Sequence, residues 1–209
     1  AGLGLISGWL VTKMKVPPFI ATLGVMTFGR GLALTYTQGK SITGLPEAFR
    51  FSGVGYLGSI PMPIVIALVV FLVAYIALTR TKFGEYIYAI GNNEIAAKLS
   101  GISVKKYVAS TYVITGALSA LAGQILIARL NSAQPVAGIG FEFDAIAAVV
   151  VGGTSFEGGE GTITGTLLGV LIIAVINNGL NLLDVPSFYQ AVVKGIVIAL
   201  ALLVHKALK

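Results

Sequence analysis

The sequence contains no cysteine, only one histidine and few charged residues. Of its 209 residues, 11% are Asp, Glu, Lys or Arg, against roughly 25% in an average soluble domain. The absence of cysteine excludes disulfide bonds and thiolate metal sites, and it leaves the cellular compartment open. Because the histidine is His205 and no cluster of Asp, Glu and His has ligand or catalytic spacing, an enzyme is the least favoured class.

Apolar residues and glycine take the place of the missing charge. Hydrophobic residues make up 56% of the chain, and the mean hydropathy is +0.93. A soluble domain of this length could not bury that much apolar surface and still cover itself with charge, so a disordered chain and a cytosolic enzyme are excluded. The 27 glycines suit membrane helices that approach closely. We therefore expect an all-α integral membrane protein. In such a protein the net charge of +6 bears on the orientation in the membrane, and we expect no nucleic-acid partner.

A transmembrane helix needs about 20 mostly apolar residues. The predicted spans are Pro17–Gln38, Met62–Thr79, Tyr107–Ala128, Gly161–Leu183 and Ser187–Val204. Ala1–Val11 is apolar without a preceding basic cluster, which is unlike a signal peptide. We interpret it as the remnant of another span. Residues 1–209 are thus predicted to be a single polytopic transmembrane domain, the C-terminal part of a longer chain with further N-terminal helices.

The distribution of Lys and Arg predicts the orientation. Arg80–Lys106 carries five basic residues, which the positive-inside rule places in the cytoplasm. The same rule places the C-terminus there, through His205, Lys206 and Lys209.

One apolar segment, Phe143–Gly153, is too short to span the membrane alone, and glycines bound it at both ends. The C-terminus returns to the cytoplasm only if this segment also crosses, as a short or broken helix continued by Thr154–Glu160. We expect Glu142 or Asp144 at its positive N-terminal end. Irregular backbone at membrane depth must be covered by protein or line a cavity. The residues alone do not decide between a pathway lining and a buried packing element.

Three glycine-containing motifs do not indicate a nucleotide-binding or catalytic site. Gly39-Lys40-Ser41 ends like a phosphate-binding loop, but Leu34 stands where that loop requires glycine. Gly158-Gly159-Glu160-Gly161 lacks the following lysine. If ATP drives this protein, another subunit must therefore bind it. The row Gly161, Gly165 and Gly169 predicts close helix packing.

The predicted cytoplasmic loop contains a short amphipathic helix. Asn92 or Asn93 can cap it, Glu94 falls in its first turn, and Gly101 suits its end. Its apolar positions follow helical spacing: Ile95, Leu99 and Ile102. Such a helix either rests on the bilayer surface or docks into a groove of a cytoplasmic partner, and the pattern alone favours neither.

The same loop carries a resemblance to a known family. Its residues Gly91, Asn92, Asn93, Glu94, Ile95, Ala96, Ala97, Leu99, Gly101 and Ile102 resemble the ATPase-coupling loop of permease subunits in bacterial ATP-binding-cassette importers of the ribose/xylose type. The Ala-Ala-x-x-x-Gly pattern with a preceding Glu is similar to the family signature, although Ile95 separates Glu94 from the alanines and the usual Ile-x-Leu-Pro is missing. Further similar stretches are Val16–Gly24, Arg30–Ala33, Asp144–Ser155, Asn177–Leu182 and Val193–Ile198.

This resemblance implies a type II importer fold in a bacterial inner membrane. It implies a monosaccharide substrate, ribose by default, and a second permease subunit, most simply in a homodimer. Two cytoplasmic ATP-binding subunits and an external sugar-binding protein would complete the complex, with membrane lipid around it. The chain itself would bind no cofactor, and its partners would use the ATP. The alternatives are a permease for a different small ligand and an ion-coupled secondary transporter. A secondary transporter should place carboxylates near the bilayer midplane to hold Na⁺ or H⁺. The Asp and Glu residues of this sequence all fall in loops or at the ends of the predicted helices, which counts against that class.

Polar residues within the predicted spans are the candidates for the pathway lining: Arg30, Gln124, Asn177, Asn178 and Asn181. Hydrogen bonding between helices is the alternative role for the asparagines. Arg30 has no acidic partner in its own helix. For Lys194 we expect extension toward the outer interface or pairing with Asp184.

Overall fold

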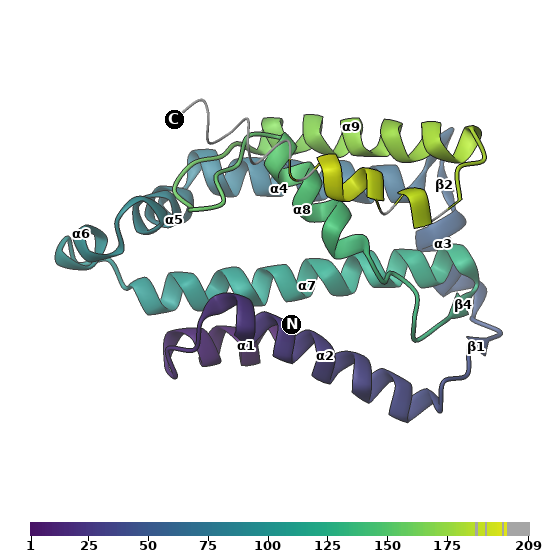
Figure 1. Cartoon of the computed structure of the whole chain (residues 1–209), viewed down its shortest axis with the longest axis horizontal. Coiled ribbons are helices and arrows are strands. Elements are labelled where there is room, and N and C mark those ends of the chain that lie inside the picture. The colour runs from purple at the N-terminus through teal and green to yellow at the C-terminus, as the bar shows by residue number, and fades with distance from the viewer. Residues whose placement is uncertain (187, 191, 198, 200–209) are drawn as a thin grey trace. The chain divides into compact units, whose positions relative to one another are not determined.

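The computed structural model describes residues 1–186, 188–190, 192–197 and 199, and helices dominate that part of the chain (Figure 1). The helices are α1 (Gly2–Thr12), α2 (Pro18–Thr37), α3 (Glu47–Val54), α4 (Met62–Arg80), α5 (Lys82–Asn92), α6 (Glu94–Leu99), α7 (Val104–Leu130), α8 (Phe141–Val151) and α9 (Ile163–Leu182). Residues 192–197 are helical as well. The strands have two residues each: β1 (Ile42–Thr43), β2 (Tyr56–Leu57), β3 (Ile60–Pro61) and β4 (Ser132–Ala133).

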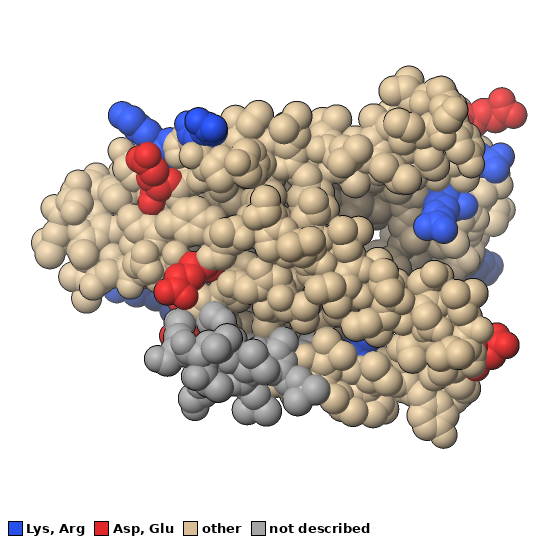
Figure 2. Space-filling model, turned by 90° about the horizontal axis from the view of Figure 1, so that it is seen from above, with Lys and Arg blue, Asp and Glu red and all other residues tan. Residues whose placement is uncertain are grey.

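Among the described residues, four helices are long and apolar enough to cross a membrane: α2, α4, α7 and α9. They have 20, 19, 27 and 20 residues, and at 1.5 Å per residue each covers about the 30 Å of a hydrocarbon core. Most of the surface visible in Figure 2 belongs to uncharged residues. These findings confirm four predicted spans and the all-α membrane fold. The predicted span Ser187–Val204 and the basic C-terminus lie partly or wholly outside the described residues.

The chain divides into two compact units, Ala1–Val70 with Gly101–Gly138, and Phe71–Ser100 with Ile139–Lys209. In the first unit, α7 is the central helix, and α1 and α3 pack against it through glycines. A Cβ atom on Gly8 would lie 3.2 Å from Ala109 Cα, and one on Gly53 would overlap the backbone of Ala128. In the same unit β1 pairs antiparallel with β4, and β2 with β3.

In the second unit, α8 packs against α9 at a distance that only glycine permits. A Cβ atom on Gly169 would overlap the carbonyl oxygen of Ala148, and one on Gly165 would overlap that of Gly152. The buried core of this contact consists of Ala147, Ala148 and Ile173. Gly165 and Gly169 therefore confirm the predicted packing row. Gly161 does not belong to the row, because Thr162 caps α9 and the helix begins at Ile163.

Helix α8 matches the predicted short helix. It has 11 residues, so its length of about 16 Å is half of a hydrocarbon core. Gly140, with a φ of 92°, precedes it, and Gly152 caps its end. Glu142 and Asp144 lie in its first turn, as predicted.

Two helices lie where only loops or one short helix are expected from the sequence. Helix α3 occupies part of the stretch between α2 and α4. Helix α5 precedes α6 and begins directly after α4, with Thr81 as its N-cap. The Thr81 side chain accepts a hydrogen bond from the Phe83 backbone N–H at 3.2 Å.

Candidate functional site

The candidate coupling segment, Gly91–Ile102, is built around Asn93, which joins two helices. Its backbone is extended, with φ −157° and ψ 101°, so the chain turns between α5 and α6. The Asn93 backbone N–H donates to the Ala89 carbonyl at 3.0 Å, which closes α5. Its side-chain Oδ1 accepts from the Ala96 N–H at 3.0 Å, which caps α6. Of the two predicted capping residues, the structure selects Asn93 for α6, with Glu94 in the first turn as expected.

Helix α6 presents two aliphatic side chains to its surroundings. Ile95 is 73% exposed and Leu99 is 84% exposed, one helical turn apart, whereas Ala97 is only 4% exposed. The predicted three-residue stripe is wrong at Ile102. The helix ends at Leu99, because Ser100 is its C-cap and Gly101 follows in the left-handed region with a φ of 84°.

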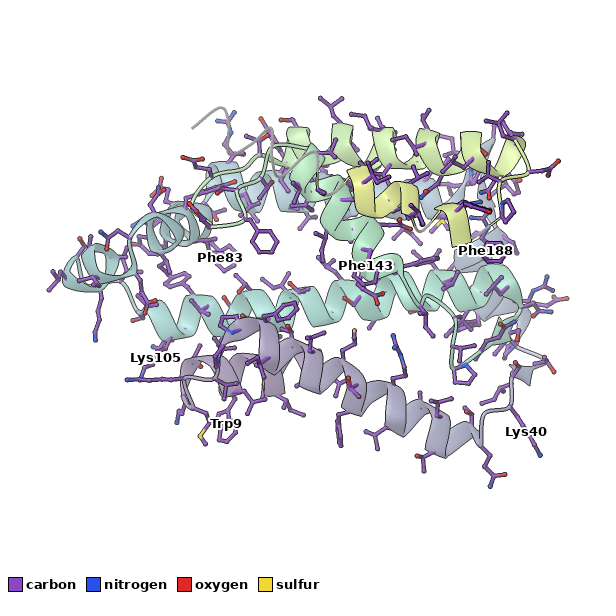
Figure 3. All side chains as sticks on the ribbon, viewed as in Figure 1. Trp9, Lys40, Phe83, Lys105, Phe143 and Phe188 are labelled. Carbon is purple, nitrogen blue, oxygen red and sulfur yellow. The ribbon has the colours of Figure 1, made fainter. Side chains whose placement is uncertain are left out.

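Helix α5 has a regular apolar pattern that the sequence interpretation missed. Phe83, Tyr86, Ile87 and Ile90 follow the spacing i, i+3, i+4 and i+7, and Thr81 provides a helix-capping residue before them. Figure 3 shows Phe83 projecting from α5. These signals were available in the sequence.

The end of α5 contacts the glycine-rich turn between α8 and α9. The Tyr88 hydroxyl donates a hydrogen bond to the Gly161 carbonyl oxygen at 2.9 Å. A Cβ atom on Gly91 would overlap the backbone nitrogen of Gly159, and one on Gly159 would meet the Asn92 side chain. The turn that follows α8 thus lies on the same face of this unit as the end of α5. The predicted membrane crossing of Phe143–Gly153 requires this arrangement, because the crossing places the turn after α8 on the cytoplasmic side, where the end of α5 is also predicted to lie.

An ion pair joins α8 to the C-terminal helical residues. Lys194 Nζ donates to Asp144 Oδ2 at 2.9 Å and lies 2.8 Å from Oδ1. The two side chains are 24% and 22% exposed, respectively. The expectation that Lys194 pairs with Asp184 is therefore wrong. Asp184 follows the end of α9 with an exposed side chain, whereas the first turn of α8 brings Asp144 to the lysine. The neighbouring Glu142 accepts a hydrogen bond from the Gly140 N–H at 2.9 Å.

The three asparagines of α9 have different surroundings. Asn181 Oδ1 accepts a hydrogen bond from Gln190 Nε2 at 2.9 Å, which fits the interhelical role. Asn177 Oδ1 is buried and accepts no hydrogen bond from the described residues. Asn178 is exposed.

The other two candidates for the pathway lining lie in the first unit. Arg30 is half-buried on α2, and Gln124 is exposed on α7. Because the asparagines belong to the second unit, a lining shared by all five residues stays a prediction. Within the described part of the chain, no three His, Cys, Asp or Glu side chains are grouped as metal ligands.

The chain is similar to sequences of known transport proteins along almost its whole length. It is 55% identical over 202 residues to the ribose import permease protein RbsC of Bacillus subtilis (strain 168), covering 96% of this chain and 63% of that protein. It is 50% identical over 208 residues to RbsC of Escherichia coli (strain K12), covering 98% and 65%. The D-allose transport system permease protein AlsC of the same strain is 43% identical over 203 residues, covering 96% and 62%.

The chain thus spans less than two thirds of the length of these relatives. No solved structure shows significant similarity to it. The family model described as "Branched-chain amino acid transport system / permease component" matches residues 1–202. This match and the membrane-spanning helices agree with the resemblance found in the coupling segment. The chain belongs to this family of transport-system permease components.

Proposed function

We propose that the chain is part of the transmembrane subunit of an ATP-driven importer whose substrate is a monosaccharide, with ribose as the first candidate. The identity of 50–55% to proteins named as ribose import permeases supports this substrate. The relative named for D-allose makes another monosaccharide the second candidate. A neutral sugar needs hydrogen-bonding groups rather than a strong fixed charge, and the amides of α9 provide such groups.

The capped helix α6 is the observation that carries the ATP-driven mechanism. Its side chains Ile95 and Leu99 stand exposed in a stretch outside the membrane-spanning helices. We infer that they fit a groove on a cytoplasmic ATP-binding subunit. These 209 residues contain no phosphate-binding loop, and in our proposal the partner subunits bind and hydrolyse the ATP.

The complex that we propose contains a second permease subunit, two ATP-binding subunits and an external sugar-binding protein in a bacterial inner membrane. ATP binding draws the two ATP-binding subunits together. The α6 helix of each permease follows its ATP-binding subunit, and the permease shifts between outward-open and inward-open states. The C-terminus of the chain lies in the cytoplasm in this arrangement.

Transport into vesicles tests this function. The full-length permease is reconstituted with its ATP-binding subunits and binding protein, and uptake of labelled ribose and allose is measured with and without ATP. We expect ATP-dependent uptake, fastest for ribose, that persists when ion gradients are abolished. Uptake that needs no ATP and follows a Na⁺ or H⁺ gradient would establish an ion-coupled transporter instead.

A further inference from the structure

The glycine turn, defined here as residues 153–161, has a fixed shape although it carries no nucleotide motif. Four of its glycines have positive φ angles: Gly153 (83°), Gly158 (94°), Gly159 (77°) and Gly161 (151°). The Ser155 N–H donates to the Glu160 carbonyl at 3.0 Å, and the Thr154 N–H donates to the Val149 carbonyl at 3.1 Å. The glycine turn is therefore closed on itself and tied to the last turn of α8.

Helix α5 is fixed at both ends by contacts between backbones. At its start, a Cβ atom on Gly84 would overlap the carbonyl oxygen of Leu78 in α4. At its end, Gly91 lies against the backbone of Gly158 and Gly159, and a Cβ atom on Gly158 would lie 3.5 Å from Gly91 Cα. The Tyr88 hydrogen bond to Gly161 adds a third attachment. Asn93 then connects α5 directly to α6.

We propose that the glycine turn transmits movement of α6 to the short helix α8, and that Tyr88 is a positioning residue for this transmission. The inference rests on the proposed function, in which an ATP-binding subunit moves α6. Backbones in direct contact have no flexible side chains between them, and close-packed groups pass on a displacement instead of absorbing it. Because Gly165 and Gly169 fix α8 to α9, a displacement of α5 reaches both helices.

Removing the Tyr88 hydroxyl tests the positioning role. In reconstituted full-length transporter, we expect Tyr88→Phe to lower the amount of sugar imported per ATP hydrolysed about fivefold, the effect of one lost hydrogen bond. Co-purification of the ATP-binding subunits should not change. Tyr36→Phe is the matched control, because Tyr36 is an exposed tyrosine on α2. An unchanged transport ratio in Tyr88→Phe would overturn the proposal.

A reversible cross-link tests whether α5 and the glycine turn move together. These 209 residues contain no cysteine, so Asn92→Cys with Gly159→Cys introduces a single cysteine pair within them. A Cβ atom on Gly159 would lie 2.8 Å from Asn92 Cγ, and a thiol at position 92 can therefore reach one at position 159. The reference for both measurements is the reduced double variant, because a Cβ atom at position 159 would also lie 2.8 Å from the Asn92 backbone nitrogen, at a φ of 77°. Relative to this reference, we expect oxidation to leave uptake unchanged and, in the Tyr88→Phe background, to raise the transport ratio. The two single-cysteine variants are the controls.

Two results of this cross-linking would contradict the proposal. If the pair does not cross-link, the contact is absent from the assembled transporter. If oxidation stops uptake and reduction restores it, α5 must slide past the glycine turn during transport. Failure of the proposed function gives a different result, because then the unaltered transporter shows no ATP-dependent uptake at all.

Discussion

Asp144 and Lys194 form an ion pair between residues 50 positions apart in the sequence, with Nζ 2.8 Å from Oδ1 and 2.9 Å from Oδ2. Both lie in apolar segments where an unpaired charge is costly. The pairing neutralises both charges and fixes the N-terminal end of α8. Asp144 also lies in the first turn of α8, where the helix dipole favours a negative charge.

Breaking this ion pair should destabilise the protein. We expect Asp144→Asn or Lys194→Met alone to cost about 2–3 kcal/mol, because each leaves one charge without its partner. This is below the cost for a fully buried pair, since about a quarter of each side chain is exposed. The free energy of unfolding in detergent measures the effect.

The double variant Asp144→Asn with Lys194→Met is the informative control. It removes both charges, so we expect it to be more stable than either single variant. If the cost of the double variant equals the sum of the costs of the two single variants, the two residues are not energetically coupled.

The contact between α8 and α9 depends on Gly169. Gly169→Ala places a Cβ atom onto the Ala148 carbonyl oxygen, so we expect a loss of about 1–3 kcal/mol of unfolding free energy. Gly179→Ala on the same helix is the matched control, because its Cβ atom would have open space and alanine favours a helix. Equal stability of the two variants would contradict the packing role.

The sequence is sufficient to predict the membrane-spanning helices and the short helix, because these features depend on local properties. Apolar length identifies α2, α4, α7 and α9, and flanking glycines delimit α8. The missed helix α5 also has a local signal in its apolar spacing, but the many basic residues of this stretch suggested a loop.

The partner of Lys194 could not be predicted, because it depends on the tertiary arrangement of the helices. Asp184 is ten residues away in sequence and Asp144 fifty, yet only Asp144 is brought to the lysine. The role of Ile102 was misjudged for a local reason. Helical spacing places it beside Ile95 and Leu99, but the positive φ of Gly101 ends the helix before it. The contact of Gly91 with Gly159 has no sequence signal, since glycine has no side chain to form a pattern.

Helix α6 should lose its partner when its exposed apolar side chains become charged. We expect Ile95→Asp with Leu99→Asp to reduce co-purification of the ATP-binding subunits at least tenfold, a cost of about 1.4 kcal/mol or more, because charges would be buried in an apolar groove. Membrane insertion should persist, since both residues lie outside the spanning helices. Unchanged co-purification would instead favour a helix that rests on the lipid surface.

The cap of α6 gives a milder change in the same contact. Asn93→Ala removes the hydrogen bond to the Ala96 N–H, which should cost about 1 kcal/mol of helix stability. We expect weaker co-purification of the ATP-binding subunits, and Asn93→Asp should restore it because aspartate caps equally well. A loss that Asn93→Asp does not restore would point to a direct contact of the asparagine amide.

The end of α6 provides the last prediction, at Gly101. Its φ of 84° lies in the left-handed region, which a β-branched residue adopts only with strain. Because a Cβ atom there would have open space within the chain, any effect must come from backbone strain or from a bound partner. We expect Gly101→Val to uncouple ATP hydrolysis from sugar uptake while insertion persists.

Gly101→Asn separates the two causes, since asparagine tolerates this conformation but still adds bulk. Recovery of uptake with asparagine would assign the defect to strain, whereas continued loss would place the partner subunit against Gly101. Wild-type uptake in both variants would show that the end of α6 has no part in coupling.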